Sequence, residues 1–263
     1  MLVRPDSRGA VVIGQPSHAW ISGQLARAWG NERFGAVEPF EEVCLAAEQH
    51  DIGMATWDVE PPRNPESGLP VSFLQMAIRD HIDLWTLAPR RLLRQSRYAA
   101  LLVSLHGTRL YANRDLRPLP ESERSLVLEF LDGQRRLQHD LLETLRADPR
   151  TAASAADPVV ARNSGLIATW DTLSLALCLD YAPYTVKGVP AAGAPVELAL
   201  SETDKPGRLS LDPWPFRADS LAVHCEGQRL DGTYSNDAAM KEALAHAPWE
   251  TLEFELAPAA AGA

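Results

Sequence analysis

The spacing of hydrophobic and polar residues predicts a chain built mostly from helices. Apolar positions recur with the period of a helix that buries one face in these segments: 17–30, 39–53, 74–85, 99–110 and 158–180. Residues 121–147 form a longer, highly charged segment, which we expect to be a helix with an exposed face. The pattern therefore favours a mainly α fold class, with a small appended antiparallel β or α+β unit.

Short alternating runs predict strands at both ends of the chain. Residues 1–15 have the pattern of a hairpin, with MLVR and AVVIGQ on either side of the turn PDSRG. From about residue 183 the runs PVELAL, GRLSL, SLAVHC and TLEFEL alternate similarly, and a helical stretch lies near 237–246. We therefore expect four parts: an N-terminal β hairpin (1–15), a helical metal-binding domain (16–182), an α+β satellite unit (183–257) and a frayed tail (258–263).

The composition argues against two classes of partner. A formal net charge of -10 disfavours broad binding to nucleic acid or to anionic membranes, because both need a basic surface. No apolar run approaches the roughly 20 residues that a membrane span requires. The N-terminal segment MLVRPDSRG lacks the apolar stretch of a secretion signal. We therefore expect a cytoplasmic protein of bacterial type that acts on a small-molecule substrate.

Ionisable residues lie on the apolar faces of the predicted helices, where an unpaired charge is costly. They are His18, His50, Asp51, His81, His106 and Asp171. Leaving an imidazole or carboxylate unpaired in a core costs several kcal/mol, so such groups are normally paired or bound to a metal. Nitrogen and oxygen donors that converge from several helices on one point describe a metal site better than a salt bridge.

The donor types indicate which ions such a site would take. Imidazole nitrogen and carboxylate oxygen suit Fe, Mn, Zn, Co or Ni. The cysteines are widely spaced in apolar segments, as buried thiols are: Cys44, Cys178 and Cys225. One divalent ion would be held by His18, His50, Asp51 and Asp171. His81 and His106 provide for a second ion, with the Asp51 carboxylate as the bridge between the two.

The order of these residues resembles the HD-domain superfamily of metal-dependent phosphohydrolases, which is named for a His-Asp pair. The match consists of His18, then His50-Asp51 at a helix end, then Asp171 in the run ATWDTLSLAL. It covers about residues 16–180, and the segments QPSHAWISGQLARAWG, EQHDIG and ALLVSLHGT also resemble an uncharacterised bacterial branch of the superfamily. A second pair, His139-Asp140, lies on the charged segment, and we interpret it as part of a solvated face.

The resemblance implies an HD-type helical fold and leaves the chemistry open. His81 and His106 are similar in order and spacing to histidines of dinuclear members, which include cyclic-dinucleotide phosphodiesterases and diiron oxygenases resembling myo-inositol oxygenase. In a hydrolase, His50 and Asp51 would be the catalytic pair, and metal-activated water would attack a small phosphate ester such as a nucleotide. In an oxygenase, the same ligands would hold iron that binds O₂ and substrate. A non-catalytic sensor of a small ligand is the third hypothesis.

Substrate contacts are expected beside the His-Asp pair. The irregular loop 55–71 follows the pair directly, and Gln15, Trp57 and Asp58 flank the site. The sequence has no Gly-Tyr-Pro element of the cyclic-dinucleotide class and no lysine next to His50-Asp51. Candidate phosphate-binding cations are Arg27, Arg33, Arg97, Arg162 and Lys187. Candidate serine nucleophiles lack the Gly-x-Ser-x-Gly context: Ser17, Ser104 and Ser174.

Overall fold

The structure is a computed structural model that describes residues 1–112, 114–205 and 207–259. Its α-helices are α1 (Gln15–Ala28), α2 (Phe40–Gln49), α3 (Ala55–Val59), α4 (Ile78–Leu92), α5 (Arg97–Ala112), α6 (Glu121–Ala147), α7 (Asp157–Cys178) and α8 (Asp237–His246). Two 3-10 turns, η1 (Ile52–Met54) and η2 (Phe73–Gln75), precede α3 and α4. No helix within the described ranges is both long and apolar enough to cross a membrane.

In the described part of the chain, seven strands form one curled sheet. They are β1 (Leu2–Pro5), β2 (Gly9–Ile13), β3 (Tyr184–Val189), β4 (Val196–Glu202), β5 (Arg208–Asp212), β6 (Leu221–Asp231) and β7 (Trp249–Pro258). Their order across the sheet is β1-β2-β6-β7-β5-β4-β3. β5 and β7 run parallel, whereas the other neighbouring strands are antiparallel. β7 continues to Pro258, and residues 260–263 of the expected tail lie outside the described residues.

The expected fold class, mainly α with a small appended antiparallel β unit, is wrong. About half of the chain is helical, and the sheet is large and mixed, with strands from both ends of the chain. Val11 of β2 lies opposite Arg229 of β6. The strands also share the helices' core, because Leu2 and Ile13 belong to the same buried cluster as Trp170. Alternation within a short run predicts a strand, but it does not show which distant strand is its neighbour.

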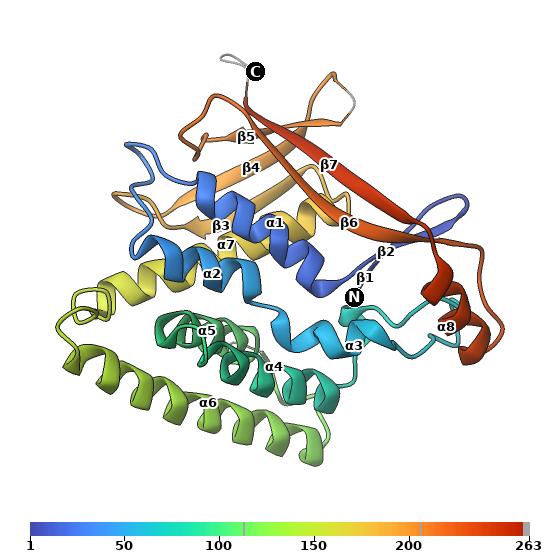
Figure 1. Cartoon of the computed structure of the whole chain (residues 1–263), viewed down its shortest axis with the longest axis horizontal. Helices are drawn as coiled ribbons and strands as arrows, with labels where there is room; N and C mark the ends of the chain where they lie inside the picture. The colour runs from blue at the N-terminus through green and yellow to red at the C-terminus, as the bar shows by residue number, and fades with distance from the viewer. Residues whose placement is uncertain (113, 206, 260–263) are drawn as a thin grey trace.

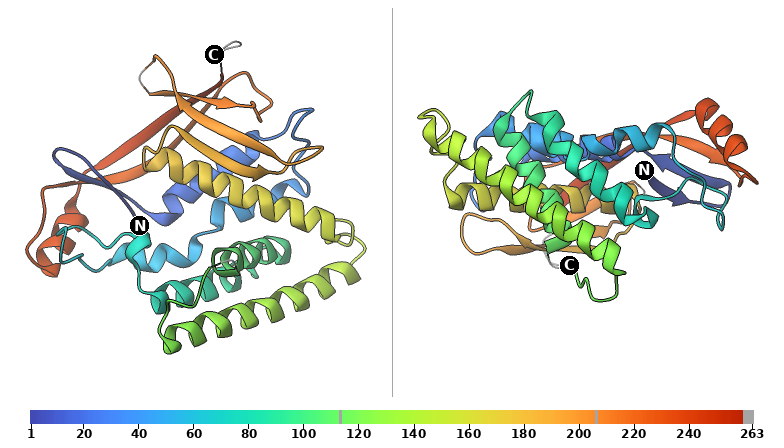
Figure 2. Two further views of the ribbon diagram at one scale, coloured as in Figure 1. Left: turned by 180° about the vertical axis from the view of Figure 1, so that it is seen from behind. Right: turned by 90° about the horizontal axis from the view of Figure 1, so that it is seen from below.

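The helices stack in layers beside the sheet. Figure 1 shows α6 on the outside, α4 and α5 next to it, α2 in the middle, and α1 and α7 against the sheet. The view from behind shows α7 running between β3 and α5 (Figure 2). Five of the six candidate ligands lie on α1, α5 and α7 and just after the end of α2, at the centre of the helical layers, and the sixth, His81, lies on α4.

Aromatic rings join the helical layers to the sheet side of the molecule. Trp29, which ends α1, meets Phe34, Trp170 and Phe216 edge-to-face, with ring centroids 5.2 to 5.6 Å apart. All of these rings are buried. Such edge-to-face pairs add about 0.5 to 1.5 kcal/mol each beyond the area that they bury. The cluster therefore fixes α1 against α7, the two helices that carry His18 and Asp171.

The start of α1 is attached directly to the sheet. β2 ends at Ile13, and the carbonyl of Gly14 accepts hydrogen bonds from the amides of Ser17 and His18. Ser17 lies inside the helix, and its Oγ donates to the carbonyl of Glu226 on β6 and accepts from the Glu226 amide. The sheet thus determines where the first turn of α1 begins, and with it the position of His18.

Candidate metal centre

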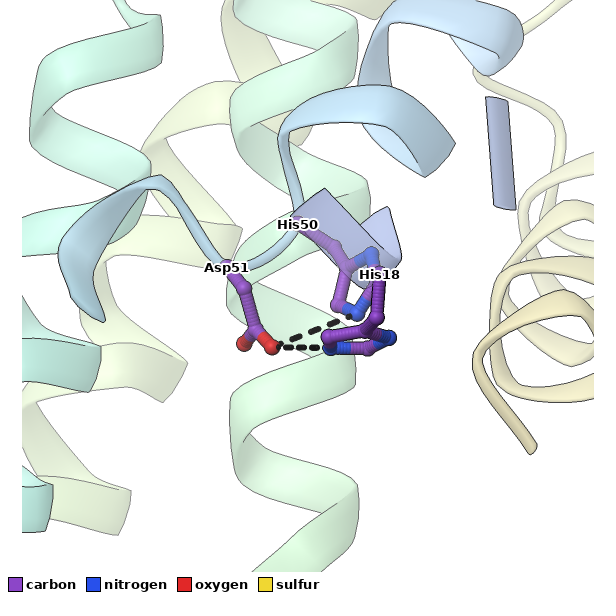
Figure 3. A group of neighbouring side chains, drawn as sticks. All are labelled: His18, His50 and Asp51. Atoms are coloured by element: carbon purple, nitrogen blue, oxygen red, sulfur yellow. Dashed lines mark hydrogen bonds and ion pairs between the residues drawn. The ribbon is translucent and has the colours of Figure 1, made fainter. Parts of the chain in front are cut away.

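The structure brings five of the predicted ligands together in one buried cluster. His18 lies in the first half of α1, His50 caps the end of α2, and Asp51 follows it before η1. His106 comes from α5 and Asp171 from α7. The three histidines and Asp51 are buried, and the Asp171 side chain is 14% exposed. Figure 3 shows His18 and His50 directed at the carboxylate of Asp51.

The hydrogen bonds around His18 determine which of its nitrogens carries a proton. Ser174 Oγ donates to the Asp171 carbonyl (2.9 Å) and accepts from Ser22 Oγ (2.9 Å). With its own proton used, Ser174 Oγ can only accept from His18 Nδ1, which lies 2.9 Å away. Nε2 of His18 then points at Asp51 Oδ2, at 2.7 Å. This ring is held with Nε2 directed into the cluster.

His50 is oriented in the same way by a backbone carbonyl. Its Nδ1 lies 2.8 Å from the carbonyl oxygen of Ala47, which can only accept, so Nδ1 carries a proton. Its Nε2 faces Asp171 Oδ1 at 3.2 Å and Asp51 Oδ2 at 3.6 Å. An imidazole that donates through one nitrogen to a carbonyl and presents the other is the usual arrangement of a metal-bound histidine.

His106, on α5, is the fifth residue of the cluster. Its Nε2 lies 3.5 Å from Asp171 Oδ2, and its ring contacts that of His50 with centroids 5.1 Å apart. Its Nδ1 is buried and has no hydrogen-bond partner among the described residues. Burial lowers the pKa of His106 to about 4, although Asp171 partly offsets the effect. This imidazole is therefore neutral at pH 7, as a metal ligand must be.

Nearby charges shift the pKa values of His50, Asp51 and Asp171. Burial by itself would lower the pKa of His50, but the carboxylates of Asp51 and Asp171 outweigh it and raise the pKa to about 9. Burial would raise the pKa of both aspartates, yet the surrounding imidazoles hold the pKa of each carboxyl below its usual value. Two ionised carboxylates thus share one buried space with a protonated imidazole, so the net charge of these three groups is negative and a cation would offset it.

The donor atoms fit a divalent transition metal in two overlapping groups. One group contains His18, His50 and Asp51, and the other contains His50, His106 and Asp171; within each, the donor atoms lie within 4.8 Å of one another. Imidazole nitrogen with carboxylate oxygen is a donor set for iron, manganese, zinc, cobalt or nickel. Because Nδ1 of His50 is bound to Ala47, His50 offers one nitrogen and can serve one ion.

The structure does not bring His81 into either group. On α4, its Nε2 accepts from Trp85 Nε1 at 3.1 Å, and its Nδ1 meets the hydroxyl of Tyr111. The Trp85 ring fits there because Gly107 has no side chain: a Cβ at Gly107 would lie 2.8 Å from that ring. His81 lines the same cavity as the cluster, but both of its nitrogens are engaged.

The expected substrate contacts divide into one residue at the site and two beside it. Gln15 lines the cavity, and its buried side-chain oxygen has no partner among the described residues. Asp58 Oδ2 accepts a hydrogen bond from the backbone N–H of Gln15 at 2.5 Å, and Asp58 Oδ1 lies 2.6 Å from the Met1 amino group. Trp57 lies on α3, outside the cavity lining. Asp58 thus acts on the site through the backbone of Gln15.

A family model described as a protein of unknown function (DUF3891) matches residues 1–232. The chain belongs to this family. The matched region includes every residue of the cluster and ends just after β6, before α8 and β7. No curated protein and no solved structure matches the chain.

A cavity of about 180 Å³ connects the cluster of this family member with its surface. Its polar lining consists of Gln15, His18, Asp51, His81, His106 and Asp171. The cations predicted to bind phosphate are not among the lining residues that the structure describes. They are held elsewhere: Arg27 by Glu48, Arg97 by Asp148, Arg162 by the Phe34 carbonyl and Lys187 by Glu197, while Arg33 lies beside Asp212 and Trp214.

Sequence analysis missed the residues that orient the ligands. The sequence offers Ser174 only as a candidate nucleophile, but in the structure its Oγ accepts a hydrogen bond from Nδ1 of His18. Its position three residues after Asp171 on one helix was the available signal, because residues at that spacing share a face. Trp85 and Tyr111 gave no signal, because aromatic residues on an apolar face read as core packing. His139, interpreted as solvated, is 71% exposed on α6.

Proposed function

We propose that this chain is a metal-dependent hydrolase of the HD type that acts on a small phosphate ester. The observation that carries the proposal is the paired orientation of His18 and His50. Each donates through Nδ1 to a fixed acceptor and directs Nε2 at Asp51, a buried carboxylate. The order of His18, His50-Asp51 and Asp171 along the chain, which resembles the HD superfamily, supports the same assignment.

The residues present fit the ion that this function needs. His18, His50, Asp51 and Asp171 would hold one divalent ion, and His106 with Asp171 would contribute to a second. Such an ion lowers the pKa of a bound water to about 7 and so supplies a nucleophile at neutral pH. The feature that supports a second ion is the pair His106 and Asp171, whose donor atoms lie within 4.8 Å of each other.

The remaining roles fall to the chain's own side chains. Both contacts recorded for Asp51 use Oδ2, which leaves Oδ1 to hold a proton or to orient the reacting water. The Ala47 carbonyl and Ser174 fix the rings of His50 and His18 before substrate arrives. The unpartnered oxygen of Gln15 can accept a hydrogen bond from the substrate or a water. Preorganised groups of this kind need no rearrangement during the reaction.

The test combines metal content with turnover. Freshly purified protein is assayed for the type and number of bound ions, then for hydrolysis of phosphomonoesters, cyclic nucleotides and dinucleotides. We expect Asp51→Ala to remove metal and activity together. His139→Ala is the matched control, since His139 is an exposed histidine with an acidic neighbour, and it should change neither. Metal-loaded protein that turns over none of these esters would disprove the proposal.

A diiron oxygenase is the second candidate, and one observation favours it. No lysine or arginine lines the cavity, as far as the described residues go, although phosphate-binding sites usually contain one. Protein purified anaerobically should then contain two irons and consume O₂ only when its substrate is added. Manganese, cobalt or nickel in place of iron would exclude this candidate.

A further inference from the structure

The mouth of the metal cavity is formed by apolar side chains that face solvent. Leu74 is 70% exposed and Leu110 is 43% exposed, and both line the cavity. Phe73, Met54 and Leu175 continue the apolar lining inward. Single exposed leucines are ordinary on protein surfaces, but exposed leucines that share the rim of a polar site mark a binding surface.

The exposure of Leu74 is built into the local backbone. Leu74 lies in the 3-10 turn η2, whose N-cap Ser72 accepts a hydrogen bond from the Leu74 amide. The side chain of Gln75 reaches back to the Ser72 amide and closes a capping box. A turn that is held at both ends presents Leu74 at the rim in a fixed position.

The cavity offers little to a polar substrate beyond the metal cluster. Outside the cluster its polar lining is Gln15 and His81, and both nitrogens of His81 are already engaged by Trp85 and Tyr111. Arg114 lies over the Tyr111 ring, 6.0 Å from its centroid, and is not part of the lining. A ribose or a nucleobase would bury donors and acceptors here without partners, which costs about 1 to 3 kcal/mol per group.

The size of the cavity also argues against a substrate as large as a nucleotide. The cavity has a volume of about 180 Å³. Cavities that enclose drug-sized ligands are about 300 to 1,000 Å³. The space therefore holds a phosphoryl-sized group and a few carbon atoms, while anything larger must lie against the leucines of the rim.

We propose that the substrate carries a compact, uncharged apolar group next to its reacting bond, and that Leu74 and Leu110 seat this group. The substrate class is then a short alkyl or aryl phosphate ester rather than a nucleotide. This inference rests on the proposed function, because it takes the cavity beside the metal cluster as the substrate site.

Binding of non-hydrolysable analogues tests the inference without relying on turnover. Metal-loaded protein is titrated by calorimetry with methyl-, ethyl-, propyl- and butylphosphonate, and with AMP. We expect affinity to rise about fourfold per methylene, which is the gain from burying one methylene. AMP should bind no better than methylphosphonate. If AMP binds more tightly than butylphosphonate, or if affinity does not change with chain length, the inference is wrong.

Leucine variants assign the effect to the rim. Leu74→Gln should weaken butylphosphonate about tenfold and leave methylphosphonate within about twofold. Leu128→Gln is the matched control, because Leu128 is a 52% exposed leucine on α6 and is not among the cavity residues. Equal behaviour of the two variants would overturn the role of the rim.

The outcomes also separate this inference from the proposed function. Turnover of nucleotides by metal-loaded protein, with no preference for alkyl chains, would retain the hydrolase and reject the apolar substrate. Absence of both phosphonate binding and ester turnover in metal-loaded protein would reject the hydrolase, and the apolar substrate with it.

Discussion

Trp85 donates its indole proton to Nε2 of His81, one turn earlier on the same helix, at a distance of 3.1 Å. The hydroxyl of Tyr111 meets the other ring nitrogen of His81. A histidine whose two nitrogens are both engaged is held by its neighbours and is not free to bind an ion. This relationship separates His81 from the other five predicted ligands, which direct their donor atoms at one another.

Removing His81 should therefore leave metal binding intact. We expect His81→Ala to retain the number of ions bound by the wild-type protein, with affinity within about threefold. His50→Ala should lose the ion, because Nε2 of His50 faces both aspartates. Elemental analysis and calorimetric titration measure both quantities. Loss of one ion in His81→Ala would instead make His81 a ligand, as the sequence predicts.

Metal binding should release a proton from His50. In the metal-free protein the aspartates outweigh burial and raise the pKa of His50 to about 9, so its ring is protonated at pH 7. An ion replaces that proton. We expect release of about one proton per ion at pH 7 and affinity that rises about tenfold per pH unit up to pH 9. Titrations in buffers with different ionisation heats count the protons, and a count of zero would contradict this prediction.

The stability of the metal-free protein should also depend on His50 above neutral pH. The pKa of His50 is raised from 6.5 to about 9 on folding. Its contribution to the free energy of unfolding is therefore fully present below pH 6.5 and is lost as the pH rises through 9. Urea unfolding at pH 6, 7.5 and 9 measures it. His50→Gln should remove most of this dependence, since the glutamine does not titrate.

Acid should destabilise the metal-free protein through His106. Burial lowers the pKa of His106 to about 4, whereas an unfolded histidine takes up a proton near pH 6.5. The unfolded chain thus binds one more proton between these values, and stability falls by up to about 3 kcal/mol as the pH drops from 6.5 to 4. Urea unfolding of wild type and His106→Gln at pH 7, 5.5 and 4.5 measures the difference. Parallel pH profiles for the two proteins would refute it.

Ser174 should matter for metal affinity although it is not a ligand. Its Oγ accepts a hydrogen bond from Nδ1 of His18. Removing a residue that orients a metal-bound histidine in this way typically lowers metal affinity by about 10 to 100-fold. We expect Ser174→Ala to lower the metal affinity by this factor and to retain the circular dichroism spectrum of the folded protein. Thr172→Ala on the same helix is the control, because its hydroxyl donates to the Ala168 carbonyl within α7. Unchanged affinity in Ser174→Ala would remove Ser174 from the site.

The turn that carries Asp51 should tolerate no side chain at Gly53. A Cβ at Gly53 would lie 2.2 Å from the carbonyl oxygen of Leu84, so α4 and η1 would have to separate. We expect Gly53→Ala to destabilise the fold by about 1 to 3 kcal/mol and to weaken metal binding. Gly133→Ala on α6 should instead stabilise it by up to about 1 kcal/mol, since only the end of Arg136 lies within 4 Å. Thermal unfolding compares the two.

The pattern of apolar and polar residues predicts the buried polar cluster better than it predicts the fold. His18, His106 and Asp171 stand out because each is an ionisable group on an otherwise apolar helix face, and that local cost is visible in one segment at a time. His81 satisfies the same criterion, but its partners Trp85 and Tyr111 are indistinguishable from core residues in the sequence. The pattern finds buried polar groups without showing what satisfies each of them.

The sheet could not be predicted in the same way. β2 and β6 pair although Val11 and Arg229 are more than 200 residues apart, and β5 pairs with β7 in parallel after an intervening strand and helix. Neither pairing leaves a mark within a single strand, because alternation reports only which face is buried. The sequence therefore predicts six of the seven described strands, all but β3, and it does not predict their order in one mixed sheet.

The hydrogen bond from Ser17 Oγ to the Glu226 carbonyl affects the thermal unfolding of the protein. It couples the turn before His18 to β6, so loss of the sheet would displace His18, and an ion bound by His18 would stabilise the strands as well as the helices. By thermodynamic linkage, saturating ion at 100 times its dissociation constant adds about 2.7 kcal/mol to the whole cooperative unit. Circular dichroism bands of helix and strand should then shift to higher temperature together, and a fragment lacking β6 and β7 should bind no ion.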